Sequence, residues 1–83
     1  MICSFNDLKK KEVIDINTAE KLGYIDDIEI ETVTSEVLSM IIYGNRGRFG
    51  LFPKEPDIVI SCSRIKVIGK EVILVKLADN SPK

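Results

Sequence analysis

The chain carries few residues with the chemistry of a catalytic or metal site. Its 83 residues include no histidine, and its two cysteines, Cys3 and Cys62, are isolated in the sequence. Histidine is the usual proton shuttle near neutral pH, and zinc sites and disulfide frameworks need closely spaced cysteines. We therefore expect a non-enzymatic protein without catalytic residues, metal or cofactor. Cys62 is expected to act as a small apolar core residue, with a bridge to Cys3 as the alternative.

Positive and aromatic side chains gather in residues 44–56, GNRGRFGLFPKEP. A connection of this length in a small domain is often functional. Arginine and aromatic side chains anchor protein interfaces, and aromatic rings also stack on bases. We predict a partner-binding surface here, and its candidate residues are Arg46, Arg48, Phe49, Phe52 and Lys54. In the alternative interpretation, the two phenylalanines only close one end of the core.

The charge balance decides which partner is favoured. Twelve lysines and arginines face thirteen acidic residues, so the net charge is -1. A strong nucleic-acid binder carries an overall basic field, which this chain lacks. An unknown protein partner is therefore the first hypothesis, with the chain also forming a homo-oligomer. An RNA- or DNA-binding module that uses the 44–56 segment is the second.

Composition also bounds the class of protein. Hydrophobic residues make up 45% of the chain and charged residues 30%, a globular balance that predicts one small domain over residues 1–77. The polar residues 78–83 are expected to form a flexible tail. No stretch approaches the roughly 20 apolar residues needed to span a bilayer, and no secretory signal is visible. We expect a cytoplasmic protein without membrane insertion.

The N-terminal part of the chain predicts a helical turn and then strands. Ser4 and Asp7 have the spacing of a capping box, and the lysines at 9–11 that follow are interpreted as a solvated helix end rather than a phosphate contact. Residues 12–16 alternate with a period of two, which predicts a strand. A second strand is expected over residues 22–32, with a β-bulge where Asp26 and Asp27 interrupt the alternation.

The strongest strand pattern lies at residues 36–44, EVLSMIIYG, because both of its faces are apolar. Leu38 is expected to share one face of this strand with Met40 and Ile42. Strands with two apolar faces are buried on both sides or pressed against a partner. We therefore predict self-association through the second face, and its candidate residues are Val37, Ile41 and Tyr43.

The C-terminal part predicts a short strand and a hairpin. Gly69 and Lys70 separate two apolar runs, as in a tight hairpin whose glycine takes a positive φ. Six short strands with polar turns and one helical turn predict an all-β fold. The architecture we expect is a small six-stranded antiparallel β-barrel.

The order of these segments resembles the PRC-barrel domain family over residues 4–75. The segments that carry the resemblance are SFNDL, KEVIDI, KLGYIDDIEIE, EVLSMIIYG and IVISCSRIKVIGKEVILV. Within the family, the chain is similar to the YlmC/YmxH branch associated with sporulation. The resemblance implies a six-stranded PRC-type barrel that works as an adaptor: such domains form part of the H subunit of the photosynthetic reaction centre, and one docks a ribosome-maturation factor onto a ribosomal protein.

Overall fold

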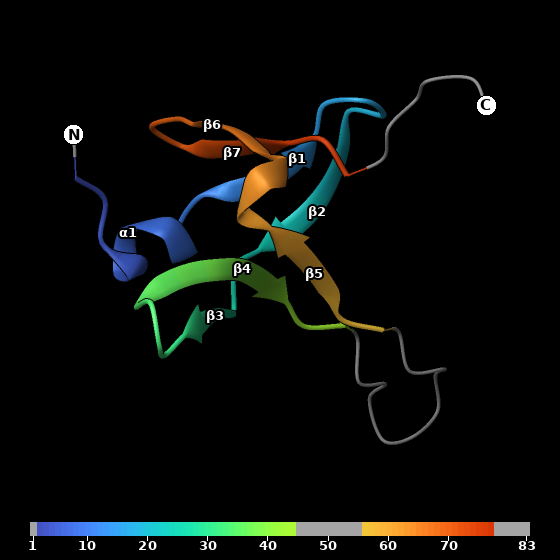
Figure 1. Cartoon of the computed structure of the whole chain (residues 1–83). Helices are drawn as coiled ribbons and strands as arrows, with labels where there is room; N and C mark the ends of the chain where they lie inside the picture. The colour runs from blue at the N-terminus through green and yellow to red at the C-terminus, as the bar shows by residue number, and fades with distance from the viewer. Residues whose placement is uncertain (1, 45–55, 78–83) are drawn as a thin grey trace, which may run out of the picture.

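Seven short strands and one helical turn make up the computed structural model, which describes residues 2–44 and 56–77 (Figure 1). The elements in chain order are α1 (Phe5–Lys9), β1 (Glu12–Asp15), β2 (Glu20–Tyr24), β3 (Asp27–Glu31), β4 (Glu36–Ile42), β5 (Ile58–Ser61), the 3₁₀ turn η2 (Cys62–Arg64), β6 (Ile65–Ile68) and β7 (Val72–Val75). The fold is therefore mostly β, as predicted, with one strand more than expected.

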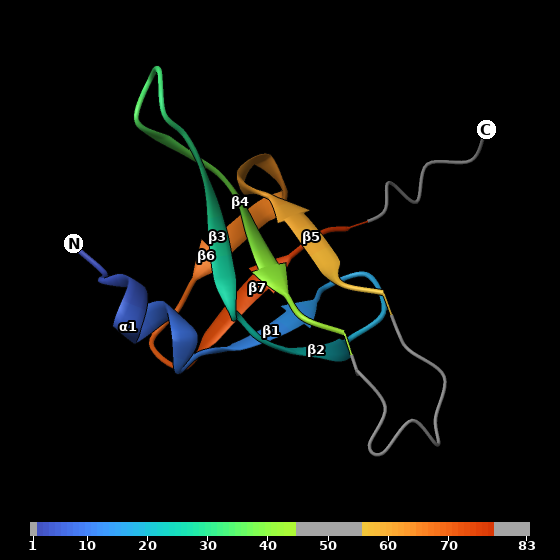
Figure 2. The ribbon, with the colours of Figure 1, turned by 90° about the horizontal axis from the view of Figure 1, so that it is seen from below.

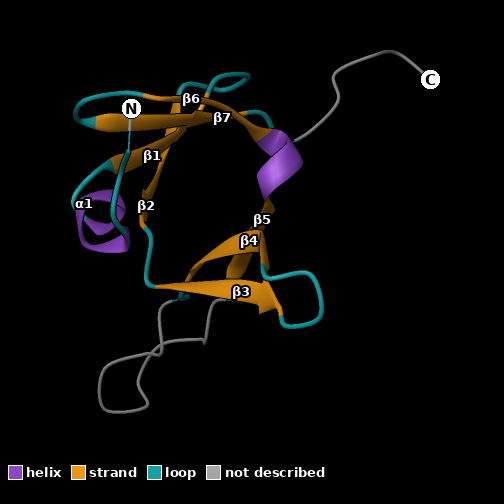
Figure 3. Cartoon of the chain, turned by 60° about the vertical axis from the view of Figure 1, so that its left-hand side comes forward, coloured by secondary structure: helices purple, strands orange, loops and turns teal. Residues whose placement is uncertain are grey.

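The strands form two sheets instead of one closed barrel. One sheet has the order β2-β1-β7-β6 and the other the order β3-β4-β5 (Figure 3). The chain passes from the first sheet to the second between β2 and β3, and returns through η2 between β5 and β6. Strands β1 and β7 run parallel, while the other pairs are antiparallel. The expected architecture, an all-antiparallel six-stranded barrel, is thus wrong in three respects. The chain has seven strands among the described residues, the two sheets do not close into one barrel, and β1 pairs with β7 in parallel.

The predicted bulge at Asp26 and Asp27 is a strand break. The backbone N–H of Asp26 donates to Ile41 O at 2.8 Å, and Ile25 beside it is almost fully buried. The alternation fails there because the chain leaves one sheet and joins the other. Register shifts do occur elsewhere, between Glu29 and Ile30 for example, where β3 pairs with β4.

The ends of α1 and the last hairpin follow local rules. The Ser4 side chain accepts from Asp7 N, and the Asp7 side chain accepts from Ser4 N, so the predicted capping box is confirmed. Strands β6 and β7 form the predicted hairpin, closed by a hydrogen bond from Gly69 N to Val72 O. Gly69 does not take the expected positive φ. Gly23 on β2 does, with φ 121°, and a Cβ added there would lie 3.4 Å from the Ile42 side chain.

The core lies between the two sheets and draws one alternating face from each. Its buried hydrophobic residues are Val13, Ile25, Met40, Ile42, Ile60, Ile73 and Val75. Asp15 is also buried, and its carboxylate accepts from Asn17 N, so this polar group is satisfied at the end of β1. Cys3 and Cys62 are unbridged and only partly buried, which makes the expectation of a core Cys62 wrong.

Candidate interaction surface

The five residues predicted to bind a partner lie outside the residues that the structure describes. They are Arg46, Arg48, Phe49, Phe52 and Lys54. What the structure does describe is how the chain enters and leaves that segment. Gly44 N donates to the Asp57 carboxylate at 2.8 Å, so the first residue of the 44–56 segment is hydrogen-bonded to the residue that follows its end. The two ends of the segment are therefore held together at the end of the three-stranded sheet.

Three aspartates meet around Tyr43 at this place. Tyr43 N donates to Asp26 Oδ2 at 2.7 Å, and the Tyr43 hydroxyl donates to Asp27 Oδ2 at 2.8 Å. The hydrogen bond from Tyr43 lowers the pKa of Asp27, and the same bond, together with the charges of Asp26, Asp27 and Asp57, raises the pKa of Tyr43. The carboxylates thus accept the backbone and side-chain donors that end β4.

The three residues predicted for self-association do not form one patch. Tyr43 is half-exposed, but its hydroxyl is bonded to Asp27. Ile41 is partly buried and pairs across the sheet with Asp27 on β3 and with Val59 on β5. Val37 lies at the other end of β4, beyond the register shift in β3-β4. Ile41 and Tyr43 therefore belong to the body of the sheet, while Val37 belongs to a separate surface.

That separate surface is the end of the β3-β4 hairpin, which projects from the body of the molecule in Figure 2. Its apolar side chains are exposed by between 43% and 88%, and we call this group the hairpin tip: Ile30, Val33, Val37 and Leu38. The expectation that Leu38 shares the buried face of Met40 and Ile42 is wrong. The register shift removes the outer part of β4 from the strict alternation, so Leu38 is half-exposed.

Acidic groups surround the hairpin tip. Glu31 pairs with Glu36 across the hairpin, and Ser39 donates to the carboxylate of Glu29 on the neighbouring strand. Exposed apolar side chains with a polar rim are the usual composition of a protein-binding patch. Sequence reasoning missed the tip as a unit because Ile30 and Val33 look like ordinary alternating and turn residues. Only the projection of the hairpin shows that they are exposed together.

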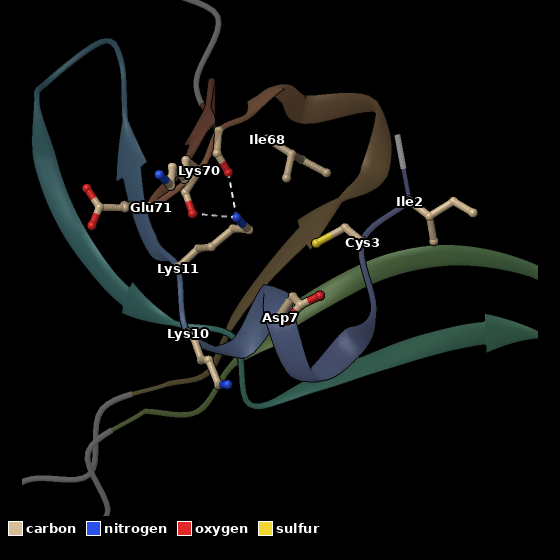
Figure 4. A pocket seen from close by; sticks show the side chains of 9 residues that line it. Ile2, Cys3, Asp7, Lys10, Lys11, Ile68, Lys70 and Glu71 are labelled. Atoms are coloured by element: carbon tan, nitrogen blue, oxygen red, sulfur yellow. Dashed lines mark hydrogen bonds between the residues drawn. The ribbon is translucent and has the colours of Figure 1, made fainter.

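A pocket of about 750 Å³ lies on the other sheet, between α1 and the β6-β7 hairpin (Figure 4). Ile2, Cys3 and Ile68 supply its apolar wall. Lys11 Nζ donates to Gly69 O and to Lys70 O, both at 2.6 Å. The interpretation of the lysines at 9–11 as a solvated helix end is therefore wrong for Lys11, which ties the start of β1 to the turn of the hairpin.

The described residues contain no group of three or more histidine, cysteine or carboxylate side chains placed to hold a metal ion. Within the same residues, no helix is long and apolar enough to cross a membrane. The pocket is also lined by Asp7, Lys10 and Glu71, and the Cys3 thiol beside them donates to the backbone oxygen of Ser4 at 3.7 Å. The hairpin tip is the feature that could contact a macromolecule, because its apolar side chains project into solvent.

Comparison with known proteins gives a consistent match. The model of the PRC-barrel domain family matches residues 3–80. The chain is 37% identical over 76 residues to a protein of Bacillus subtilis named "Probable sporulation protein YlmC", covering 92% of this chain and 94% of that protein. It is 47% identical over 72 residues to an uncharacterized protein of Clostridium acetobutylicum, covering 87% and 82%. It is 29% identical over 79 residues to YmxH of Bacillus subtilis, covering 93% and 92%.

Proposed function

This chain belongs to the PRC-barrel family, and we propose that it is a non-enzymatic, cytoplasmic adaptor that binds a protein partner during sporulation. The link to sporulation comes from its relative in Bacillus subtilis. The observation that carries the adaptor role is the hairpin tip. Four apolar side chains that project together are costly to leave in water and are typical of a docking surface.

The rim of the hairpin tip supports a partner of particular chemistry. Glu29, Glu31 and Glu36 surround the apolar side chains with negative charge. A complementary partner would present an apolar groove with lysine or arginine at its edges. Val33, at the turn of the hairpin, is exposed by 88% and is the side chain best placed to enter such a groove. The residues of the 44–56 segment would supply a second contact, at the opposite end of β4.

The test is capture of partners by the tagged protein from sporulating cells, with nuclease treatment throughout. The tip variant is Val33→Ser combined with Leu38→Ser. Its matched control is Val67→Ser combined with Ile68→Ser, which removes two half-exposed apolar side chains from β6 on the other sheet. We expect a protein partner that survives nuclease, is retained by the control and is lost with the tip variant.

One result would contradict the adaptor role, and another would contradict only its assignment to the hairpin tip. If every captured protein disappears after nuclease, the chain binds nucleic acid instead. If the partner is retained by the tip variant but lost when Phe49 and Phe52 are replaced, an adaptor role would stand and the contact would belong to the 44–56 segment. Circular dichroism of each variant checks that the fold is intact.

A further inference from the structure

The four edge strands of the two sheets differ in how they are protected against pairing with another chain. Exposed edges are normally blocked by charged side chains, bulges or irregular backbone. Strand β3 carries Asp27, Glu29 and Glu31, and β6 carries Lys66 at a register shift. Strand β2 carries Glu20, Lys21 and the left-handed Gly23. Three of the four edges therefore have a recognisable block.

Strand β5 has none of these features. Its sequence is Ile-Val-Ile-Ser, without a charged residue, and its register with β4 is continuous over four residue pairs. Among the described residues, it pairs with β4 alone, and it forms the outer edge of its sheet (Figure 2). Its alternation is regular, since Ile60 is buried in the core and Val59 is 57% exposed on the outer face. Strand β5 therefore offers an uncharged edge without a register shift, to which another strand could pair.

We propose that β5 pairs with β5 of a second copy of this chain, so that two three-stranded sheets join into one six-stranded sheet. The charge pattern favours a copy at this edge. A β3-β3 pair centred on Glu29 would set carboxylate against carboxylate, and like charges directly opposite are destabilising. A β5-β5 pair brings no such repulsion. Antiparallel pairing of identical strands also gives a closed two-fold dimer, and the joined sheet then ends on both sides in the acidic strand β3.

The two-fold axis fixes which residues can face one another. The outer faces of the two sheets must lie on the same side of the joined sheet. A residue whose side chain points outward, such as Val59, must therefore pair with an outward-pointing residue of the copy. Centring the pair on Val59 places Ile58 opposite Ile60 of the copy. It also places Asp57 opposite Ser61, so that the carboxylate meets a hydroxyl and not another carboxylate. Val59 then contacts Val59 of the copy, and Ile41, its neighbour on β4, extends this apolar strip.

The inference deepens the proposed adaptor function by naming one partner, a second copy, but uses a different surface. The β5 edge and the hairpin tip involve different side chains, Val59 on one and Val33 on the other. A chain that fails to dimerise could still capture a partner through the tip. Likewise, the chain could dimerise through β5 even if the capture experiment found no partner. The two experiments can therefore fail independently.

The first measurement is sedimentation of the purified full chain at increasing concentration. The monomer has a mass of 9.3 kDa, and we expect the wild type to approach twice that mass. Val59→Lys places two ammonium groups opposite each other and is expected to remain monomeric. Val67→Lys is the matched control, because Val67 is a half-exposed valine on another edge strand and its replacement should leave the mass of the dimer unchanged.

Charge reversal keeps the test independent of folding. Val59→Glu alone should also be monomeric, whereas an equimolar mixture of Val59→Lys and Val59→Glu should regain the doubled mass. Amide hydrogen exchange provides the second readout, with protection in β5 rising with concentration in the wild type. A monomeric wild type over the whole range, a dimer that Val59→Lys leaves intact, or a mixture that stays monomeric would each overturn the proposal.

Discussion

Replacing Lys11 with methionine tests whether one charged side chain holds the two ends of the first sheet together. Lys11 follows α1 and donates from Nζ to Gly69 O and Lys70 O, which are 58 and 59 residues away in sequence. Methionine keeps most of the unbranched stem but has no donor. The substitution therefore removes both hydrogen bonds while leaving the packing of the stem against the hairpin nearly unchanged.

The expected loss follows from the geometry of these bonds. A hydrogen bond from a charged donor contributes about 1.5–3 kcal/mol when it is shielded from water. Here one bond is partly buried and the other is exposed, so water replaces much of what is lost. We expect the free energy of unfolding to fall by about 1.5 kcal/mol in total. In a domain of this size that corresponds to a melting temperature lower by roughly 6–12 °C.

The assay is thermal and urea unfolding followed by circular dichroism, with Lys10→Met as the control. Lys10 is the adjacent exposed lysine; its backbone N–H donates to Asp7 O, but among the described residues its side chain makes no hydrogen bond or ion pair. The control should therefore melt within about 2 °C of the wild type, because surface substitutions away from specific contacts have small effects. Equal melting temperatures for Lys11→Met and Lys10→Met would refute the role assigned to Lys11.

Two further predictions concern the second sheet and its link to the first. Gly23→Ala should lower the free energy of unfolding in urea by about 1–3 kcal/mol, because φ 121° strains any residue with a Cβ. The space itself is sufficient, since the added Cβ would lie 3.4 Å from Ile42 Cγ2, an ordinary contact. A loss below about 0.5 kcal/mol would argue against this backbone conformation. Tyr43→Phe removes the bond that lowers the pKa of Asp27 and raises that of Tyr43. Its destabilisation should be full between about pH 5 and pH 9 and should shrink as pH falls through the folded pKa of Asp27 or rises above about 10, toward the raised pKa of Tyr43. In urea titrations, a destabilisation that did not shrink as pH falls through the folded pKa of Asp27 or rises above about 10 would contradict the link.

Local features of the fold were predictable from the sequence because their physical cause lies within a few residues. The capping box of Ser4 and Asp7 and the β6-β7 hairpin depend on neighbouring positions, and both were predicted correctly. The alternation of apolar residues predicted most strands to within a residue or two. The same local signals cannot say which strand pairs with which. Thus the parallel pairing of β1 with β7, which are far apart in the sequence, was missed.

The candidate surfaces show the same division. The apolar character of residues 36–44 was visible in the sequence and correctly indicated the strand β4. The sequence alone could not separate Val37 from Ile41 and Tyr43, because the shift of register that divides them depends on how β3 pairs with β4. Lys11 was misinterpreted for a related reason, since the carbonyls that it contacts belong to a distant turn.

The sequence by itself determined the class of this protein: a small β-rich chain of the PRC-barrel family, with no histidine and a nearly balanced charge. The β-rich character follows from composition, periodicity and local capping, which need no knowledge of distant contacts, whereas the family follows from the match of residues 3–80 to the PRC-barrel domain. Only the tertiary structure decided which apolar residues are exposed together and which edge of a sheet is unprotected. Exposure and pairing depend on what covers a residue, and the covering segments here come from remote parts of the chain.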